Sequence, residues 1–177
     1  FAMAQKISAL SLGDAALKKI GIRKGLPETE DQALVYLFMA SSSLSGDDYE
    51  KLLDDFIRQF PANADGYLRR ANYYAAKGKD DHAWYDKAVA DFNQALKVAQ
   101  KKDDVYYNIG KLMYAYQLSK PEKTYKDWTY DTALKNLRQA IAIDPLPVYT
   151  QLEGDILFAQ QDYAGALACL LYTSDAA

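Results

Sequence analysis

The side chains best suited to catalysis or metal binding are few in this sequence and are not arranged for either role. The chain has one histidine, His82, and one cysteine, Cys169, too few to anchor a usual zinc site. The acidic residues around the histidine, Asp80, Asp81 and Asp86, are typical of a solvated turn. The sequence contains no glycine-rich phosphate loop, no Gly-x-Ser-x-Gly elbow and no His-Asp-Ser set. We therefore expect no catalytic residue, no metal site and no cofactor.

Both tryptophans lie in polar segments between apolar helical patterns, and they are candidates for a partner contact. Trp84 and Trp128 fall in corresponding turns, so the two turns should emerge along the same edge of a stack of helix pairs. Tryptophan is enriched at the centre of protein interfaces. Alternatively, each ring folds back against the first turn of the helix that follows and extends the core. Both interpretations remain open, and the second is preferred.

The elements that position these residues follow from a spacing that occurs twice between Tyr67 and Pro145. Each occurrence has an aromatic residue, a small residue four positions later, and an Ala followed by apolar residues at four and seven positions. The members are Tyr67, Ala71, Ala88, Phe92 and Ala95, and then Tyr106, Gly110, Ala133, Leu137 and Ala140. Small residues let two antiparallel helices approach closely, and large apolar residues fill the space around the crossing. The spacing predicts an all-α fold of stacked helix pairs, since one pair alone cannot bury its apolar face.

The same register predicts four repeats, which together form one domain over residues 28–171. Their ranges are 28–61, 62–101, 102–145 and 146–171. In each second helix a tyrosine stands three residues before the Ala position: Tyr49 before Leu52, Tyr85 before Ala88, Tyr130 before Ala133, and Tyr163 before Ala166. A ring at that position can pack across the helix pair while its hydroxyl reaches water. We expect these four tyrosines to be structural.

The spacing resembles the tetratricopeptide repeat, a helix–turn–helix unit of about 34 residues. The resemblance covers roughly Glu28 to Leu170, and the stretch from Asp47 to Ala71 is similar to exported repeat proteins of the Bacteroidetes. It implies a right-handed α-solenoid of about four helical hairpins that binds a protein or peptide in a concave groove lined by first helices. The register then places these residues in the groove: Leu68, Asn72, Tyr107, Lys111, Tyr114, Gln151 and Asp155. One departure is Arg70, which stands at a position where leucine is usual.

The two ends of the sequence depart from the repeats. Ala2-Met3-Ala4 has the small-x-small form that signal peptidase recognises, so residues 1–4 are expected to end a signal peptide. The protein would then be exported, in the periplasm; a truncation with an alanine-rich start is the alternative. Residues 5–27 are expected to form an N-terminal cap helix and linker. Residues 172–177 are expected to be a disordered or artefactual tail.

Composition narrows the class of partner. The net charge of −3 argues against nucleic acid, which would need a concentrated basic face, and no apolar run is long enough to span a membrane. We therefore expect a non-catalytic scaffold for a protein or peptide partner. Two alternatives remain: a component of an envelope-assembly machinery, and a repeat region that belongs to a longer enzyme or sensor.

Overall fold

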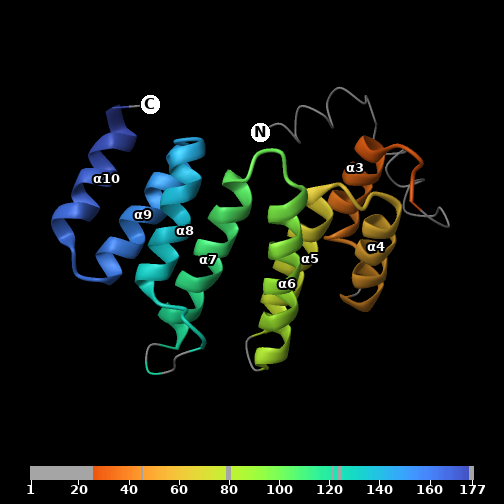
Figure 1. Ribbon diagram of the computed structural model, residues 1–177, viewed down its shortest axis with the longest axis horizontal. Helices are drawn as coiled ribbons and strands as arrows, with labels where there is room; N and C mark the ends of the chain where they lie inside the picture. The colour runs from red at the N-terminus through yellow and green to blue at the C-terminus, as the bar shows by residue number, and fades with distance from the viewer. Residues whose placement is uncertain (1–25, 45, 79–80, 121, 123–124, 176–177) are drawn as a thin grey trace.

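The computed structural model describes residues 26–44, 46–78, 81–120, 122 and 125–175, and these residues form helices without any strand (Figure 1). Eight helices occur in this part of the chain: α3 (Glu30–Ala40), α4 (Gly46–Gln59), α5 (Ala64–Lys77), α6 (His82–Val98), α7 (Asp103–Ser119), α8 (Tyr130–Ile143), α9 (Pro147–Ala159) and α10 (Tyr163–Asp175). The expected all-α class is therefore confirmed. Figure 1 shows the helices side by side in a row, from α3 and α4 at one end to α9 and α10 at the other.

Small residues lie where paired helices touch, as the spacing predicts. A Cβ atom built on Gly110 of α7 would stand 2.9 Å from the carbonyl oxygen of Ala133 in α8. In the next pair, a Cβ built on Gly154 of α9 would stand 3.6 Å from the carbonyl oxygen of Ala166 in α10. The same two positions of the register thus meet in both pairs. A larger side chain at either position would push the two helix backbones apart.

The pairs are joined to one another through large residues of each second helix. Phe56 of α4 is fully buried beside Gly66 of α5, where a built Cβ would lie 2.7 Å from the phenyl ring. Phe92 of α6 shares a core cluster with Val105 of α7. Leu137 of α8 shares another cluster with residues of α9, including Tyr149, Leu152 and Ile156. The second helices α4, α6 and α8 are therefore each covered by the first helix of the next pair.

The tyrosines that precede the Ala positions take two different arrangements. Tyr130 packs on Tyr114 across the α7–α8 pair, with ring centroids 6.0 Å apart, and Tyr163 packs on Phe158 across the α9–α10 pair at 5.3 Å. Tyr49 instead contacts Tyr73 of the following pair at 5.8 Å. Its ring therefore ties two pairs together.

Helix ends are fixed by local hydrogen bonds. The Asn63 side chain accepts a hydrogen bond from the Asp65 amide and caps α5. Thr129 and Thr132 exchange hydrogen bonds in a capping box that starts α8. At the other end of α8, Asp144 is the C-cap before Pro145, whose ring cannot continue the helix.

Two expectations about segments differ from the structure, and others fall outside it. Trp84 lies inside α6 and not in a turn, because Asp81 caps the helix by accepting from the Ala83 amide and so starts it before the ring. Residues 172–175, expected in a tail, belong to α10. The signal-peptide end and most of the cap segment fall in residues 1–25, which lie outside the described residues.

Candidate partner-binding surface

The first helices α5, α7 and α9 contact one another in succession and form one continuous face, called here the α5–α7–α9 face. The Asn72 amide of α5 donates to Asn108 Oδ1 of α7 at 3.1 Å. The Tyr107 ring of α7 lies against Tyr149 of α9, with centroids 4.8 Å apart. Polar and aromatic contacts thus hold the three helices in register along this face.

Most residues assigned to a groove from the sequence do lie at exposed or half-buried positions. Asn72, Lys111, Gln151 and Asp155 are exposed. Leu68 differs, since only 8% of it is exposed and it packs in the core with Ala71 and Phe92. It therefore supports the α5–α7–α9 face from beneath and offers no surface to a partner.

Two half-buried rings, Tyr107 and Tyr114, bring aromatic surface to this face. Burial raises the pKa of Tyr107 above its ordinary value, and the carboxylates of Asp104 and Asp155 add to the rise. Burial also raises the pKa of Tyr114, and the charge of Asp155 again adds to the rise. Asp155 therefore acts on both rings, and both hydroxyls stay protonated at neutral pH.

A cation lies beside the same rings. The Lys111 ammonium stands 5.8 Å from the centroid of the Tyr107 ring. Lysine, aspartate, amides and tyrosine rings thus share one surface, in which a cation and a carboxylate can each pair with a partner group of opposite charge. This mixture suits recognition of a polypeptide, whose own groups are equally varied.

Sequence reasoning missed two contributors to this face. Only 3% of Tyr149, on α9, is exposed, and its ring packs against the Tyr107 ring of α7. Asp104 accepts from the Asn108 amide at 3.0 Å and so orients the group that receives the Asn72 hydrogen bond. The register could not reveal these contacts, because they join residues 42 and 4 positions apart through side chains whose directions the spacing does not fix.

Trp128 is part of the core and not of a surface. Only 2% of its area is exposed, and its ring meets Tyr85, Tyr116 and Tyr125 nearly edge to face, at centroid distances of 4.8 to 5.5 Å. The turn before α8 thus places its tryptophan against the start of α6. The ring extends the core, as the preferred interpretation expects, but it packs against α6 and α7 and not against the first turn of α8.

Trp84 lies in a different cluster and is half-buried. Its ring packs on Tyr74 at 5.6 Å, with the ammonium groups of Lys77 and Lys87 at 4.6 and 4.1 Å from its centroid. The two tryptophans therefore do not combine into one aromatic contact surface. Each is engaged within the protein.

The turn between α7 and α8 is anchored to α6 by polar contacts as well. The Tyr125 hydroxyl donates to Asp86 at 2.6 Å, and the Lys126 ammonium pairs with the same carboxylate. Hydrogen bonds from Lys126 and then Tyr125 lower the pKa of Asp86. Lys126 adopts a left-handed backbone conformation with φ of 53°, which a non-glycine residue rarely takes without such support.

His82 belongs to this aromatic cluster. Its Nε2 atom lies 3.2 Å from the Tyr116 hydroxyl, and its ring packs at a tilt of 48° against the Tyr125 ring, with centroids 4.5 Å apart. Within the described ranges, no group of three or more His, Cys, Asp or Glu side chains is placed to hold a metal ion. His82 therefore serves packing between α6, α7 and the turn that follows α7.

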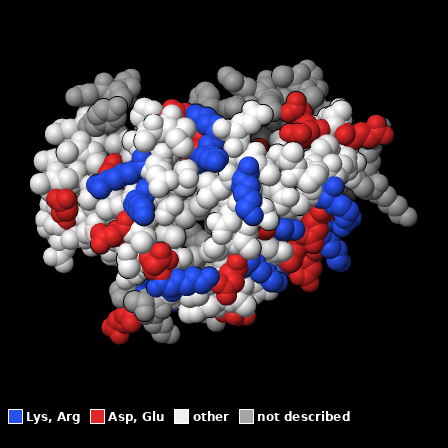
Figure 2. Space-filling view, in the orientation of Figure 1, with Lys and Arg blue, Asp and Glu red and all other residues white. Residues whose placement is uncertain are grey.

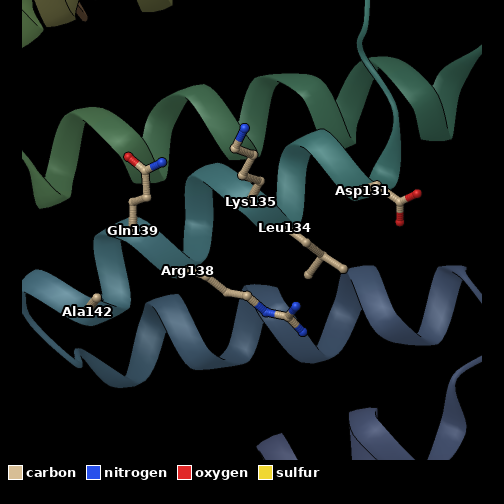
Figure 3. A pocket seen from close by; sticks show the side chains of 6 residues that line it. All are labelled: Asp131, Leu134, Lys135, Arg138, Gln139 and Ala142. Carbon is tan, nitrogen blue, oxygen red and sulfur yellow. The ribbon is translucent and has the colours of Figure 1, made fainter.

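Two of the surface hollows lie beside α8. One is a trough along α8, of about 470 Å³, and Figure 3 shows that its lining residues, such as Lys135 and Arg138, all come from that helix. Arg138 points toward α9 and pairs with Glu153 at 2.7 Å. The other hollow, of about 220 Å³, lies between α6, α7 and α8 beside Trp128 and has mainly apolar walls.

Charge is mixed over the face seen in Figure 2, where Lys and Arg side chains alternate with Asp and Glu. Several charged side chains of the described residues are paired: Arg58 with Asp55, Lys51 with Asp48, and Lys77 with Glu50. That face therefore presents no broad area of one sign.

Comparison with known proteins gives no family assignment: no protein-family model matches the chain, and no curated protein matches it significantly. Among the described helices, none is both long enough and apolar enough to cross a membrane.

Proposed function

We propose that the chain is an α-solenoid of the tetratricopeptide type that acts as a non-catalytic scaffold and holds a protein or peptide on its α5–α7–α9 face. The observation that carries this proposal is the continuity of that face: the Asn72–Asn108 hydrogen bond joins its first two helices, and the Tyr107–Tyr149 ring contact joins its last two. A ligand that crosses these contacts meets three helices held in one register. Such a preorganised surface loses little conformational entropy on binding.

The occupant we propose is an extended or helical polypeptide segment with both charged and apolar side chains. Lys111 and Asp155 offer opposite charges on neighbouring helices, and the exposed amides of Asn72 and Gln151 offer donors and acceptors for a peptide backbone. Nucleic acid fits less well, because phosphate binding requires a concentrated basic surface and the chain carries a net charge of −3.

A binding selection tests the proposal. Random peptides displayed on phage would be selected against the immobilised protein, and the affinity of the recovered peptides measured by fluorescence anisotropy. Lys111→Glu combined with Asp155→Lys should weaken binding by at least about tenfold, because two desolvated charge contacts become repulsive. Both residues are exposed, so the fold should be retained.

The control is Lys135→Glu, which reverses one exposed charge on the α8 trough of Figure 3. It should leave peptide affinity unchanged. Loss of binding in Lys135→Glu, with full binding in the double variant, would move the site to α8 and overturn the proposal. Failure to select any peptide would overturn it as well.

A further inference from the structure

The hollow between α6, α7 and α8, called here the α6–α8 hollow, occupies the same place in the register as the α8 trough. Val89 and Asn93 of α6 line the hollow, one and five residues after the Ala position, and Leu134 and Arg138 line the trough at the same positions of α8. The described lining of the trough comes from α8 alone. The hollow is also lined by α7 and by the turn before α8, so it is enclosed on more sides.

The walls of the α6–α8 hollow are mainly apolar. Phe92 and Trp128 are each 2% exposed, and five further apolar side chains that border the hollow are half-buried. Those five are Val89, Leu96, Ile109, Leu112 and Met113. A concave, apolar surface of this kind favours a ligand whose own body is apolar.

The residue before the small position of each first helix explains why this space is open. In α5 it is Arg70, which pairs with Asp54 of the preceding helix pair. In α9 it is Glu153, which pairs in the same way with Arg138. In α7 it is Ile109, which borders the hollow. A shorter, uncharged side chain thus stands where the other two helices extend a charged one toward the pair before them.

Asn136 supplies a polar contact in the same hollow. It stands three residues after the Ala position of α8, as Asp91 does in α6, where Arg70 binds it. The Asn136 amide nitrogen donates to the Thr132 carbonyl at 2.9 Å. Since that carbonyl only accepts, the side-chain oxygen of Asn136 is turned away from it, and none of the described residues donates to this oxygen. A ligand with one O–H or N–H group can.

Charge and size narrow the class of ligand. Lys126 and Asp127 bring one charge of each sign to the hollow, and Lys126 is paired with Asp86. The hollow is therefore neutral overall, and an ion would lose hydration on entering its apolar part. An apolar cavity of about 150 Å³ holds one benzene molecule, so a hollow of about 220 Å³ holds about nine non-hydrogen atoms by the same ratio.

We propose that the α6–α8 hollow binds a small neutral aromatic molecule of this size, with its ring among the apolar side chains and one O–H or N–H group donating to the Asn136 side-chain oxygen. Phe92, Trp128 and the Met113 thioether favour a ring over an alkyl chain, because ring–ring and sulfur–ring contacts add to the burial of apolar area.

The site is separate from the α5–α7–α9 face. Ile109, Leu112 and Met113 lie on the opposite side of α7 from Tyr107 and Lys111, because the helix completes a turn every ~3.6 residues. Failure of the small-molecule site would therefore leave the proposed peptide site untouched, and the reverse also holds.

Indole is a suitable probe, since it is neutral, matches the hollow in size and has one N–H donor. Indene, in which a CH₂ group replaces the N–H, is the matched control ligand. Isothermal titration calorimetry of the full chain should give a Kd for indole below about 1 mM, and binding of indene should be about threefold to tenfold weaker. Asn136→Leu should remove this difference. Nuclear Overhauser contacts between indole and the Met113 methyl group should place the ligand in the hollow.

A pair of tryptophan variants tests the location independently. Asn93→Trp fills the hollow and should weaken indole binding at least about tenfold. Arg138→Trp makes the same change at the equivalent position of the α8 trough and should leave the affinity unchanged. Circular dichroism checks that both variants are folded.

Three results would overturn the proposal. The first is no binding of indole at up to about 5 mM. The second is indole affinity that is retained in folded Asn93→Trp, with ligand contacts at residues outside the hollow. The third is loss of affinity for the selected peptides in Asn93→Trp, which would show that the hollow takes a side chain of the polypeptide partner instead.

Discussion

Arg70 and Asp91 form a two-bond ion pair that locks α5 to α6: Nε donates to Oδ2 and Nη2 donates to Oδ1, both at 2.7 Å. The remaining arm of the guanidinium reaches α4, where Nη1 donates to Asp54 at 2.7 Å. These bonds, those to Asp91 foremost, raise the pKa of Arg70 above its ordinary value. One arginine at a position where leucine is usual thus connects two helix pairs.

Removal of the buried carboxylate should cost far more stability than removal of the exposed one. Asp91→Ala leaves Arg70, whose side chain is 21% exposed, without its main partner, and should lower the free energy of unfolding by about 2–3 kcal/mol. Asp54 is 44% exposed, so Asp54→Ala should cost less than about 1 kcal/mol. Urea unfolding followed by circular dichroism measures both. Equal losses of unfolding free energy in the two variants would show that the two-bond pair with Asp91 stabilises the fold no more than the single bond to Asp54.

The approach of α7 to α8 can be tested at its closest point. Gly110→Ala places a methyl group 2.9 Å from the Ala133 carbonyl oxygen, a backbone atom that cannot move away cheaply. The strain should exceed the gain of about 1 kcal/mol in helix propensity, with a net loss of about 1–3 kcal/mol.

The control for this substitution lies in the next pair. In Gly154→Ala the new methyl meets the Cys169 Cβ at 3.3 Å and the Ala166 carbonyl oxygen at 3.6 Å. Strain and propensity should roughly cancel, so the urea midpoint should move little. The α7–α8 pair has the closer approach of the two, 2.9 Å against 3.6 Å to the facing carbonyl oxygen. A larger loss of stability in Gly154→Ala than in Gly110→Ala would contradict this difference.

Much of the fold could be predicted from the sequence because the determining feature is local. Gly110 and Gly154 each stand in a first helix, at the position that pairs with Ala133 and Ala166 of the second helix, and small residues at these positions imply close helix pairs even though the turns between them differ in length. The register predicts a turn around Trp84 because it counts only the residues between the repeated spacing positions. It does not reveal whether extra residues lengthen a helix or a loop.

The candidate surface was predicted less completely, for a physical reason. The register places a side chain on one side of a helix, but a position at the edge of that side can turn inward, as Leu68 does. Arg70 and Asp91 lie 21 positions apart in sequence, on α5 and α6. Their ion pair depends on the exact distance between these two helices, which the sequence spacing does not determine. Contacts that depend on the direction of a side chain can be identified only from the three-dimensional structure.

The two tryptophans should report different environments. Trp84→Phe leaves only the buried Trp128, whose emission should be blue-shifted and little quenched by iodide, because 2% of that residue is exposed. Trp128→Phe leaves only the half-buried Trp84, which should emit at longer wavelength. Trp128→Ala should cost about 3–5 kcal/mol through the cavity it creates. Equal iodide quenching in the two phenylalanine variants would contradict the burial of Trp128.

The hydrogen bond from the Tyr149 hydroxyl to Asp103 Oδ2, at 3.1 Å, should make stability depend on alkaline pH. Burial, and then the charge of Asp103, raise the pKa of Tyr149 well above its ordinary value. Above about pH 10 the unfolded chain releases this proton while the folded protein keeps it, so the stability that Tyr149 contributes is complete below about pH 10 and falls above it.

Tyr149→Phe isolates this effect, because all other tyrosines titrate alike in both proteins. Near neutral pH the variant should be less stable by about 1–2 kcal/mol, since Asp103, 5% exposed, loses the Tyr149 donor and is left with the Lys101 ammonium at 3.5 Å. Above about pH 10 the difference should shrink by up to about 1.4 kcal/mol for each pH unit. Urea unfolding of both proteins over this range provides the measurement. A difference that stays constant through the alkaline range would mean that the Tyr149 hydroxyl titrates as it does in water, and that the buried link between α7 and α9 beneath the α5–α7–α9 face is not formed.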